Sequence, residues 1–374
     1  MLSDPDGQPP VAGDPLDGAT ILLDCRWLGR GGAGRLTEML LDELAEARPG
    51  GVWRLWGEAA RLAPHVFPGA SVAPWSGHPM KWFGQEDLLR VPANDVAVYL
   101  HQVRPLRPGL SITFVLDTIP LRFGGRRWVR WAKGLFFRIA CRLSARVITI
   151  SAWSRESIIR DLHVPRRRLV VTSLAVDPAR VGRMRALRAS SPRGDHVLYV
   201  GRFADHKNLP RLCRAFQSTT FRRDGGHLVL VGGAPREVAG LSRLVARERL
   251  DGVDVRGECT EADLDLLLAT CRALVQPAME EGYGLPAVEA AAVGVQVAVT
   301  RAGVAPQIPE ALASFMDALD ESSIASAIDE AVGRGDSDVY WPPRSTLAAD
   351  LLTILRDALA RDDPTSGRGR LSRD

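Results

Sequence analysis

Two glutamates, Glu281 and Glu289, lie eight positions apart around a glycine-rich turn. Pro286 suits the first turn of a helix, because its missing N–H costs nothing there, so we expect a helix to begin at this point. Gly282 and Gly284 then lie just before the helix, where residues without a Cβ let backbone N–H groups approach an anion. Both carboxylates can face one crevice. The segment therefore predicts a site for a ligand with phosphate and hydroxyl groups, such as a nucleotide sugar.

A second set of residues fits the phosphate part of that ligand. Lys207 is one of three lysines in the chain and follows Gly201 and Arg202 between an expected strand end and an expected helix start. A surface cation at a helix start would give the same pattern. We favour a phosphate role for Arg202 and Lys207, because donors aimed at a leaving diphosphate stabilise the transition state more than the ground state.

Together these segments resemble the retaining GT-B glycosyltransferases of family 4, group 1, a mannosyltransferase-like family in which Glu-x7-Glu closes the donor site. The other motifs that carry the resemblance occur in the family's order between residues 20 and 355. They are Gly31-Gly32-Ala33-Gly34-Arg35, Asp117-Thr118-Ile119-Pro120-Leu121, Ile148-Thr149-Ile150-Ser151 with Ser154, and Val200-Gly201-Arg202 followed by Lys207-Asn208-Leu209.

The resemblance implies a metal-independent transfer of a hexose-type sugar from a UDP-, GDP- or dTDP-linked donor to a hydroxyl of a small molecule, a glycan or a lipid-linked sugar. It implies retention of configuration, with the departing phosphate taking the acceptor proton, and no cofactor. Glu289 would bind the ribose and Glu281 the transferred sugar. The implied catalytic residues are Glu281, Asp117, Arg202 and Lys207. The implied donor-binding residues are Gly31, Gly32, Gly34, Arg202, Lys207, Glu281, Gly282, Tyr283, Gly284, Leu285 and Glu289.

The chain departs from the family pattern around the sugar. Leu116 stands where the family usually has a histidine, Gln307 where a glutamate is common, and Gln296 where a proline is usual. His101 follows an expected strand and is a partial substitute, although such a histidine is more often structural. Two other functions therefore stay open: a catalytically silent nucleotide-sugar-binding protein, and a pseudo-glycosyltransferase with a cyclitol donor. Slow donor hydrolysis would distinguish a transferase from a silent binder.

Composition agrees with a two-domain protein. The 374 residues exceed what one core usually supports, and 46% of them are hydrophobic. No apolar stretch is long enough for a membrane span, and residues 1–18 lack the pattern of a signal peptide, so we expect a cytoplasmic protein. The five cysteines are dispersed without zinc-site spacing, which predicts reduced thiols that are mostly buried.

Apolar runs alternate with helical patterns along the chain, which predicts parallel sheets covered on both faces. Strands are expected at 21–24, 95–100, 112–116, 147–150, 169–172, 196–200, 227–231, 253–255, 273–276 and 295–299, and helices near 209–217, 261–271 and 286–293. The expected fold is α/β, GT-B, with two Rossmann-like domains facing across a cleft. The expected parts are a disordered tail (1–18), an N-terminal acceptor domain (19–176), a C-terminal donor domain (177–338), a helix folding back onto the first domain (339–360) and a second disordered tail (361–374). The crossing is expected at 176–178.

One segment, residues 118–155, has nine Arg or Lys residues and no acid. Its basic helix at 126–142 would allow a weak peripheral contact with an anionic membrane. Trp128, Trp131, Leu135 and Ile139 also form one apolar face at helical spacing, which is the ordinary pattern of a core-facing helix. We favour the core-facing interpretation. No nucleic-acid-binding motif accompanies the charge.

Overall fold

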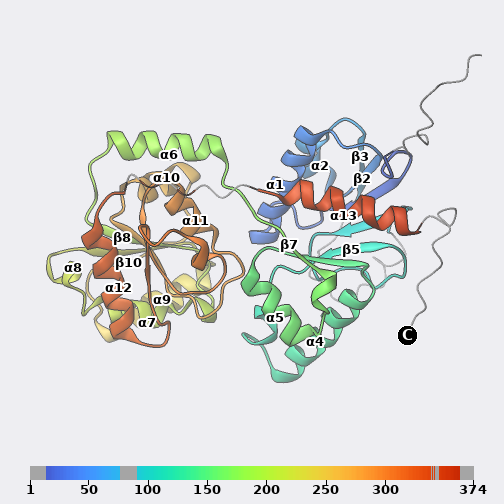
Figure 1. Ribbon diagram of the computed structural model, residues 1–374. Coiled ribbons are helices and arrows are strands. Elements are labelled where there is room, and N and C mark those ends of the chain that lie inside the picture. The colour runs from blue at the N-terminus through green and yellow to red at the C-terminus, as the bar shows by residue number, and fades with distance from the viewer. Residues whose placement is uncertain (1–13, 76–90, 338, 340, 342–344, 363–374) are drawn as a thin grey trace, which may run out of the picture.

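The computed structural model describes residues 14–75, 91–337, 339, 341 and 345–362. It contains two α/β domains side by side, each built on one parallel sheet with helices on both faces (Figure 1). This is the predicted fold class.

The N-terminal domain has a seven-stranded sheet in the order β3-β2-β1-β4-β5-β6-β7. Strand order reverses between β1 and β4, which is where a doubly wound sheet opens a crevice for ligands. The strands are β1 (Thr20–Asp24), β2 (Val52–Gly57), β3 (Ala70–Pro74), β4 (Val96–Tyr99), β5 (Ser111–Phe114), β6 (Arg146–Thr149) and β7 (Leu169–Val171). The helices are α1 (Gly31–Ala47), α2 (Ala59–Leu62), η1 (Ala63–His65), η2 (Ile119–Leu121), α4 (Arg127–Arg142), α5 (Ala152–Leu162) and η3 (Arg166–Arg168).

The C-terminal domain has a six-stranded sheet in the order β10-β9-β8-β11-β12-β13, with its reversal between β8 and β11. The strands are β8 (His196–Val200), β9 (His227–Val231), β10 (Val253–Val255), β11 (Ala273–Gln276), β12 (Gln296–Val299) and β13 (Ala313–Phe315). The helices are α6 (Pro178–Ser190), η4 (Asp205–Lys207), α7 (Leu209–Phe216), α8 (Thr220–Arg223), α9 (Pro235–Glu248), α10 (Glu261–Thr270), α11 (Leu285–Ala292), η5 (Ala305–Gln307) and α12 (Glu321–Arg334).

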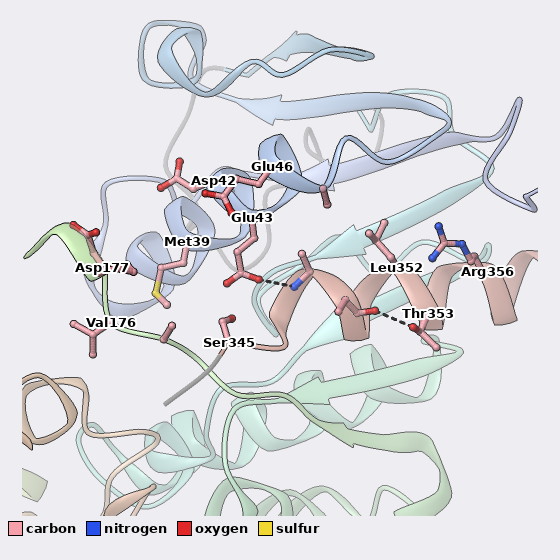
Figure 2. Close-up of a pocket in the computed structure, with 15 residues that line it drawn as sticks. Met39, Asp42, Glu43, Glu46, Val176, Asp177, Ser345, Leu352, Thr353 and Arg356 are labelled. Carbon is pink, nitrogen blue, oxygen red and sulfur yellow. Dashed lines mark hydrogen bonds between the residues drawn. The ribbon is translucent and has the colours of Figure 1, made fainter. Parts of the chain in front are cut away.

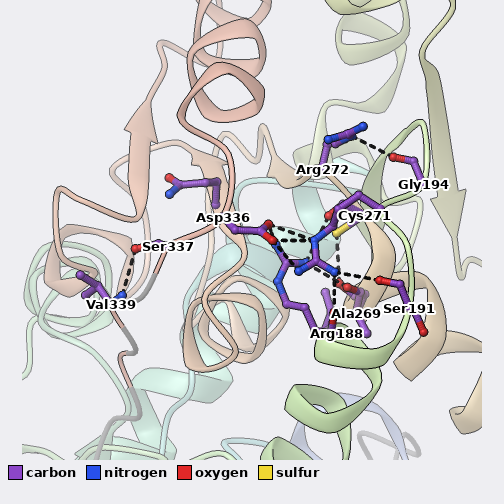
Figure 3. Close-up of polar contacts among 12 residues, drawn as sticks. Arg188, Ser191, Gly194, Ala269, Cys271, Arg272, Asp336, Ser337 and Val339 are labelled. Carbon is purple, nitrogen blue, oxygen red and sulfur yellow. Dashed lines mark hydrogen bonds and ion pairs between the residues drawn. The ribbon is translucent and has the colours of Figure 1, made fainter.

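The chain crosses from the first domain to the second just before α6. Asp177 caps this helix, because its carboxylate accepts hydrogen bonds from the N–H groups of Ala179 and Arg180. Near the other end of this helix, buried Arg188 pairs with Asp336 and donates to the carbonyl oxygen of Ala269, which fastens α6 to the segment leaving α12 (Figure 3).

The last helix, α13 (Leu347–Asp362), returns to the N-terminal domain and packs on α1 (Figure 1). Glu43 accepts a hydrogen bond from the Ala348 N–H at 2.9 Å, and Arg356 binds Asp14 with two guanidinium nitrogens. These contacts put α13 on the first domain, as expected. The predicted disordered tails fall largely outside the described residues.

The basic helix α4 is oriented differently from the expectation. In α4 the side of the helix that enters the core carries Phe137, Ala140 and Cys141. Trp128 and Trp131 are 66% and 70% exposed. The core-facing interpretation of the Trp128–Trp131–Leu135 face is therefore wrong, because the buried stripe of α4 lies on the opposite side of the helix.

Four of the five cysteines are buried, and Cys259 is exposed; all five are free thiols. In the part of the chain that the structure describes, every helix is too short or too polar to cross a bilayer. The cytoplasmic location stays a prediction.

Candidate functional site

A cavity of about 590 Å³ lies where the carboxyl ends of strands from both sheets meet. Its walls include most of the predicted site residues and come from both domains. The N-terminal domain contributes Gly31, Gly32, Arg35, Leu116, Asp117, Ile119 and Pro120, and the C-terminal domain contributes Gly201, Arg202, His206, Lys207, Gln276 and residues 281–286. Parallel α/β sheets bind ligands at this end of their strands.

The C-terminal wall of the cavity carries two cations and a carboxylate. Gly201 and Arg202 follow β8, and Lys207 ends the short η4 turn. The Lys207 ammonium lies 2.5 Å from the Glu281 carboxylate, which belongs to the loop after β11. Arg202 keeps 78% of its side-chain area exposed, and its nearest carboxylate is Glu237 at 3.6 Å. One cation is thus held against a carboxylate in the cavity, and the other has room to swing toward a ligand.

Two helix N-termini face the cavity. Gly284 has φ +96° and directly precedes α11, whose first residues Leu285 and Pro286 line the cavity. On the opposite wall α1 begins at Gly31. The N–H groups of a helix's first turn have no partner within the helix and carry partial positive charge, so two such ends make an anion-binding place.

The glycines of the N-terminal motif are residues of helix α1. A Cβ on Gly31 or Gly32 would meet nothing within 4 Å, so both leave room at the cavity wall. Gly34 differs from them, because a Cβ there would lie 2.7 Å from the carbonyl oxygen of Trp27. Gly34 is outside the cavity wall and allows α1 to pack closely on the preceding turn.

Asp117 follows β5 and comes close to the other domain. Its Oδ1 accepts a hydrogen bond from the Ile119 N–H at 2.9 Å, and its Oδ2 lies 3.3 Å from where a Cβ on Gly282 would be. Burial raises the pKa of Asp117 to about 6, and the negative charges of Glu281 and Glu280 act in the same direction. The carboxyl group is consequently a proton acceptor near neutral pH.

Glu289 differs from the expectation. It lies one turn into α11, as predicted, but it is 3% exposed and is not among the residues that line the cavity. Its carboxylate accepts from the Arg180 guanidinium at 2.9 Å and pairs with Arg35 of α1. Arg180 also binds Asp265 at 2.8 Å. Of the two arginines that engage Glu289, Arg35 lines the cavity and Arg180 does not.

Contacts across the domain boundary fix the turn after Glu281. The hydroxyl groups of Ser151 and Ser154 both donate to the Gly282 carbonyl oxygen, at 2.7 and 3.2 Å. The buried Tyr283 hydroxyl donates to the Leu174 carbonyl oxygen at 2.7 Å. Arg122 of the first domain pairs with Glu280 of the second.

Among the cavity residues that were not predicted as site residues, two have titratable side chains, Arg35 and His206. Arg35 ends the glycine motif, and its link to Glu289 could not be read from the sequence. His206 precedes Lys207, and burial, together with the Lys207 charge, lowers its pKa to about 4, so the imidazole is neutral at pH 7. His206 lies between Arg202 and Lys207 in the sequence, and both of these were predicted to bind phosphate. This position could have identified His206 as a site residue.

The substituted family positions lie as follows. Leu116 lines the cavity, whereas Gln296 is buried in β12 and Gln307 is exposed in η5. His101 stacks on Trp27 with ring centroids 4.1 Å apart and accepts the Val103 N–H. It is not among the cavity-lining residues, so it does not substitute for the missing histidine.

A larger cavity, of about 890 Å³, lies elsewhere, between α1, α13 and the crossing segment (Figure 2). Met39, Val176 and Leu352 form apolar parts of its wall, and Asp42 and Glu46 stand at its edge. It contains none of the predicted site residues. Across the described ranges no group of His, Cys, Asp or Glu side chains is placed to hold a metal ion.

Comparison with known proteins agrees with this geometry. Residues 186–339 match the family described as glycosyl transferases group 1. The O-antigen chain mannosyltransferase B of Escherichia coli is 30% identical over 190 residues, which are 49% of this chain and 50% of that protein. The chain therefore spans about half the length of this curated relative.

Solved structures extend the likeness to nearly the whole chain. The sucrose-phosphate synthase from Thermosynechococcus elongatus superposes with a TM-score of 0.64 at 18% identity, covering 91% of this chain and 94% of that one. HepE of Anabaena in complex with UDP and glucose gives 0.61 at 18% identity, covering 91% and 95%. The fold is that of the GT-B glycosyltransferases. The C-terminal domain matches the group 1 glycosyltransferase family, with a mannosyltransferase among its relatives.

Proposed function

We propose that the protein is a retaining glycosyltransferase that moves a hexose from a nucleoside diphosphate sugar to an acceptor hydroxyl. The observation that carries the proposal is the cavity that two helix N-termini, Arg202 and the Lys207–Glu281 ion pair line together. Such a cavity suits a ligand that has a diphosphate between two hydroxyl-bearing groups. The mannosyltransferase relative and the neighbour solved with UDP and glucose support the same class of donor.

The diphosphate would be held by cations and backbone N–H groups from both walls. Arg202 is free to swing toward it, and Lys207 would share its charge between Glu281 and a phosphate oxygen. Hydrogen bonds to charged groups contribute about 1.5–3 kcal/mol each. Because the leaving diphosphate gains charge as the bond to the sugar breaks, these contacts strengthen in the transition state, and the proposal needs no divalent metal.

The hydroxyl groups of the ligand would meet the carboxylates. Glu281, beside Lys207, would accept a hydrogen bond from a hydroxyl group of the transferred sugar. Glu289 would accept one from a ribose hydroxyl group after its ion pair with Arg35 has broken. Arg35, which already lines the cavity, could then bind the diphosphate. Asp117 would accept a hydrogen bond from a sugar or acceptor hydroxyl on the opposite wall.

Transfer with retention needs no protein nucleophile. The bond between the anomeric carbon and the phosphate oxygen breaks, and the acceptor oxygen bonds to the anomeric carbon on the same face. The acceptor proton passes to the phosphate oxygen that has separated from the sugar, and the nucleoside diphosphate then leaves. The charges of Arg202 and Lys207 keep that phosphate next to the acceptor while the proton moves.

A donor screen tests the function. Thermal shifts with UDP, GDP, dTDP and ADP should identify the base, because a ligand raises the melting temperature according to its concentration relative to its Kd. The matching nucleotide sugars should then release nucleoside diphosphate slowly in water and faster with a saccharide acceptor, free or lipid-linked. Binding without any release over many hours would instead favour the catalytically silent binder.

A further inference from the structure

The outward face of α4 carries large apolar side chains that lie open to solvent. Trp128 is 66% exposed, Trp131 70% and Leu135 44%. Their spacing of three and four residues puts them on one side of the helix, opposite the buried Phe137. Trp153 on the adjoining helix α5 is 39% exposed. Three large apolar side chains side by side on one exposed helix face are typical of an interaction surface.

Cations lie beside this face. Arg126 directly precedes the helix, and helical spacing puts Arg127 and Arg142 close to the Trp128–Trp131–Leu135 side. None of these three arginines forms an ion pair with any residue in the described part of the chain. Elsewhere in the molecule arginines commonly pair, as Arg214 does with Glu248. Helix α4 thus combines exposed indole rings with arginines that form no ion pair among the described residues, and it contains no acidic residue of its own.

We propose that this face, Trp128, Trp131 and Leu135 with their neighbouring arginines, lies on the surface of an anionic lipid bilayer. Indole rings favour the headgroup level of a membrane, where the apolar body and the N–H find suitable surroundings, and guanidinium groups pair with lipid phosphates. Each cation near an anionic surface strengthens binding about fivefold.

A second copy of the chain fits this face less well. In a twofold dimer the same patch meets itself, so the arginines of one copy would lie against those of the other. Like charges in an interface oppose association. A bilayer of anionic lipids supplies the opposite charge instead.

The location of the face is useful for the proposed reaction, and this step rests on the proposed function. Helix α4 packs against η2, whose Ile119 and Pro120 line the donor cavity. A chain lying on its α4 face would therefore hold the N-terminal wall of the cavity near the lipid surface. An acceptor sugar linked to a lipid would be the matching substrate.

Vesicle binding of the full chain tests the proposal. Sedimentation with phosphatidylcholine vesicles containing about 30% phosphatidylglycerol should retain the wild type at about 0.1 M salt, and pure phosphatidylcholine should not. Trp128→Ala/Trp131→Ala should weaken binding at least tenfold. Arg126→Glu/Arg127→Glu should weaken it by a similar factor, while Glu at a helix start leaves the helix stable. A matched control, Leu266→Ala/Leu319→Ala, removes two exposed leucines from the other domain and should bind like wild type.

Brominated lipids give a second readout, taken first on the wild type and then on a conservative variant. They should quench part of the wild-type tryptophan fluorescence, and the quenched part should be missing from Trp128→Phe/Trp131→Phe. Absence of wild-type binding to the anionic vesicles, or wild-type-like binding by both of the α4 double variants, would overturn the proposal. So would a concentration-dependent dimer that Trp128→Ala/Trp131→Ala abolishes. Hydrolysis of a water-soluble donor needs no vesicle, so its persistence would show that only the membrane proposal had failed.

Discussion

Lys207 and Glu281 form an ion pair, with Nζ and Oε2 2.5 Å apart, that joins the turn after β8 to the loop after β11. Both strands flank the point where strand order reverses. The pair therefore preorganises a cation and a carboxylate at the place where an open α/β sheet binds its ligand. A bound phosphate would compete with Glu281 for Lys207, and a bound sugar would compete with Lys207 for Glu281.

Replacing Glu289 by glutamine should raise the donor KM about tenfold and change kcat little, because a ribose contact acts in ground and transition states alike. The same change should lower the free energy of unfolding by about 1–3 kcal/mol, since Arg180 loses a buried charged partner. Steady-state kinetics and urea unfolding measure the two effects.

Asp265→Asn is the matched control for this prediction. Asp265 binds the same Arg180 from the α10 side, and it does not line the cavity. It should lower stability by a similar amount and leave the donor KM unchanged. Equal KM values for Glu289→Gln and wild type would make Glu289 a purely structural residue.

Asp117 should make the stability of the protein depend on pH. Its folded pKa of about 6 lies above the ordinary value of 3.8, so the folded state holds the proton more strongly. The resulting stabilisation is complete below pH 4 and is lost as the pH rises through 6. Asp117→Asn keeps an acceptor for the Ile119 N–H and avoids the buried charge. Its stability relative to wild type should increase by about 1–2 kcal/mol between pH 4.5 and 7.5, because Asp117 is only half-buried and solvent screens part of its charge.

Urea unfolding at four or five pH values checks this result. A constant difference between Asp117→Asn and wild type over the whole range would mean that Asp117 titrates normally. It would then be a solvated carboxylate and not a group held in a water-poor cavity.

Trp131 and Phe137 provide a paired test of how α4 is oriented. Phe137→Ala removes a fully buried ring and should cost about 3–5 kcal/mol of stability. Trp131→Ala removes an exposed ring and should change stability by less than about 0.5 kcal/mol. Similar losses for both variants would restore the core-facing interpretation of Trp131.

The orientation of α4 could not be predicted from the sequence. The apolar spacing of Trp128, Trp131 and Leu135 identified one face of a helix, and spacing alone cannot tell whether that face meets a core or a solvent-exposed surface. The stripe that does enter the core is short and includes Ala140 and Cys141, which give a weaker signal than two tryptophans.

Strand prediction succeeded where the pattern is local. The limits of β8, β9, β10 and β11 agree with the expected ones. β8, β9 and β11 are largely apolar runs between turn residues, whereas β10 alternates Val-Asp-Val. β2, β3 and β13 were missed. β2 contains Arg54 and ends in Gly57, and β3 is an edge strand ending in Pro74, so both lack a continuous apolar run.

The candidate site was predictable in part for a similar reason. Lys207 follows β8, and Glu281 and the glycine-rich turn at 282–284 follow β11. The carboxyl ends of parallel strands meet at one edge of a sheet, so these residues were expected to lie close together. The partners of Glu289 were not predictable, because Arg35 and Arg180 come from other helices and meet it only through tertiary packing.

Ligand binding should draw the two domains together. Arg202 and Lys207 reach the diphosphate from one domain and the first turn of α1 reaches it from the other, so full contact requires a closed cleft. Small-angle scattering should show a smaller radius of gyration with the cognate nucleoside diphosphate than without it. The nucleoside alone, which lacks the anion, should leave the radius unchanged; contraction with the nucleoside would assign closure to the base instead.

The most direct test of the phosphate site is the turnover of Arg202→Ala/Lys207→Ala, measured as nucleoside diphosphate release from the donor found in the screen. Loss of two charge-assisted contacts should lower kcat/KM by at least about a hundredfold. The exposed pair Arg236→Ala/Arg243→Ala on α9 removes the same charge and should turn over like wild type. Circular dichroism should show both double variants folded. A folded Arg202→Ala/Lys207→Ala variant with near wild-type turnover would contradict the account, because the diphosphate would then be bound elsewhere.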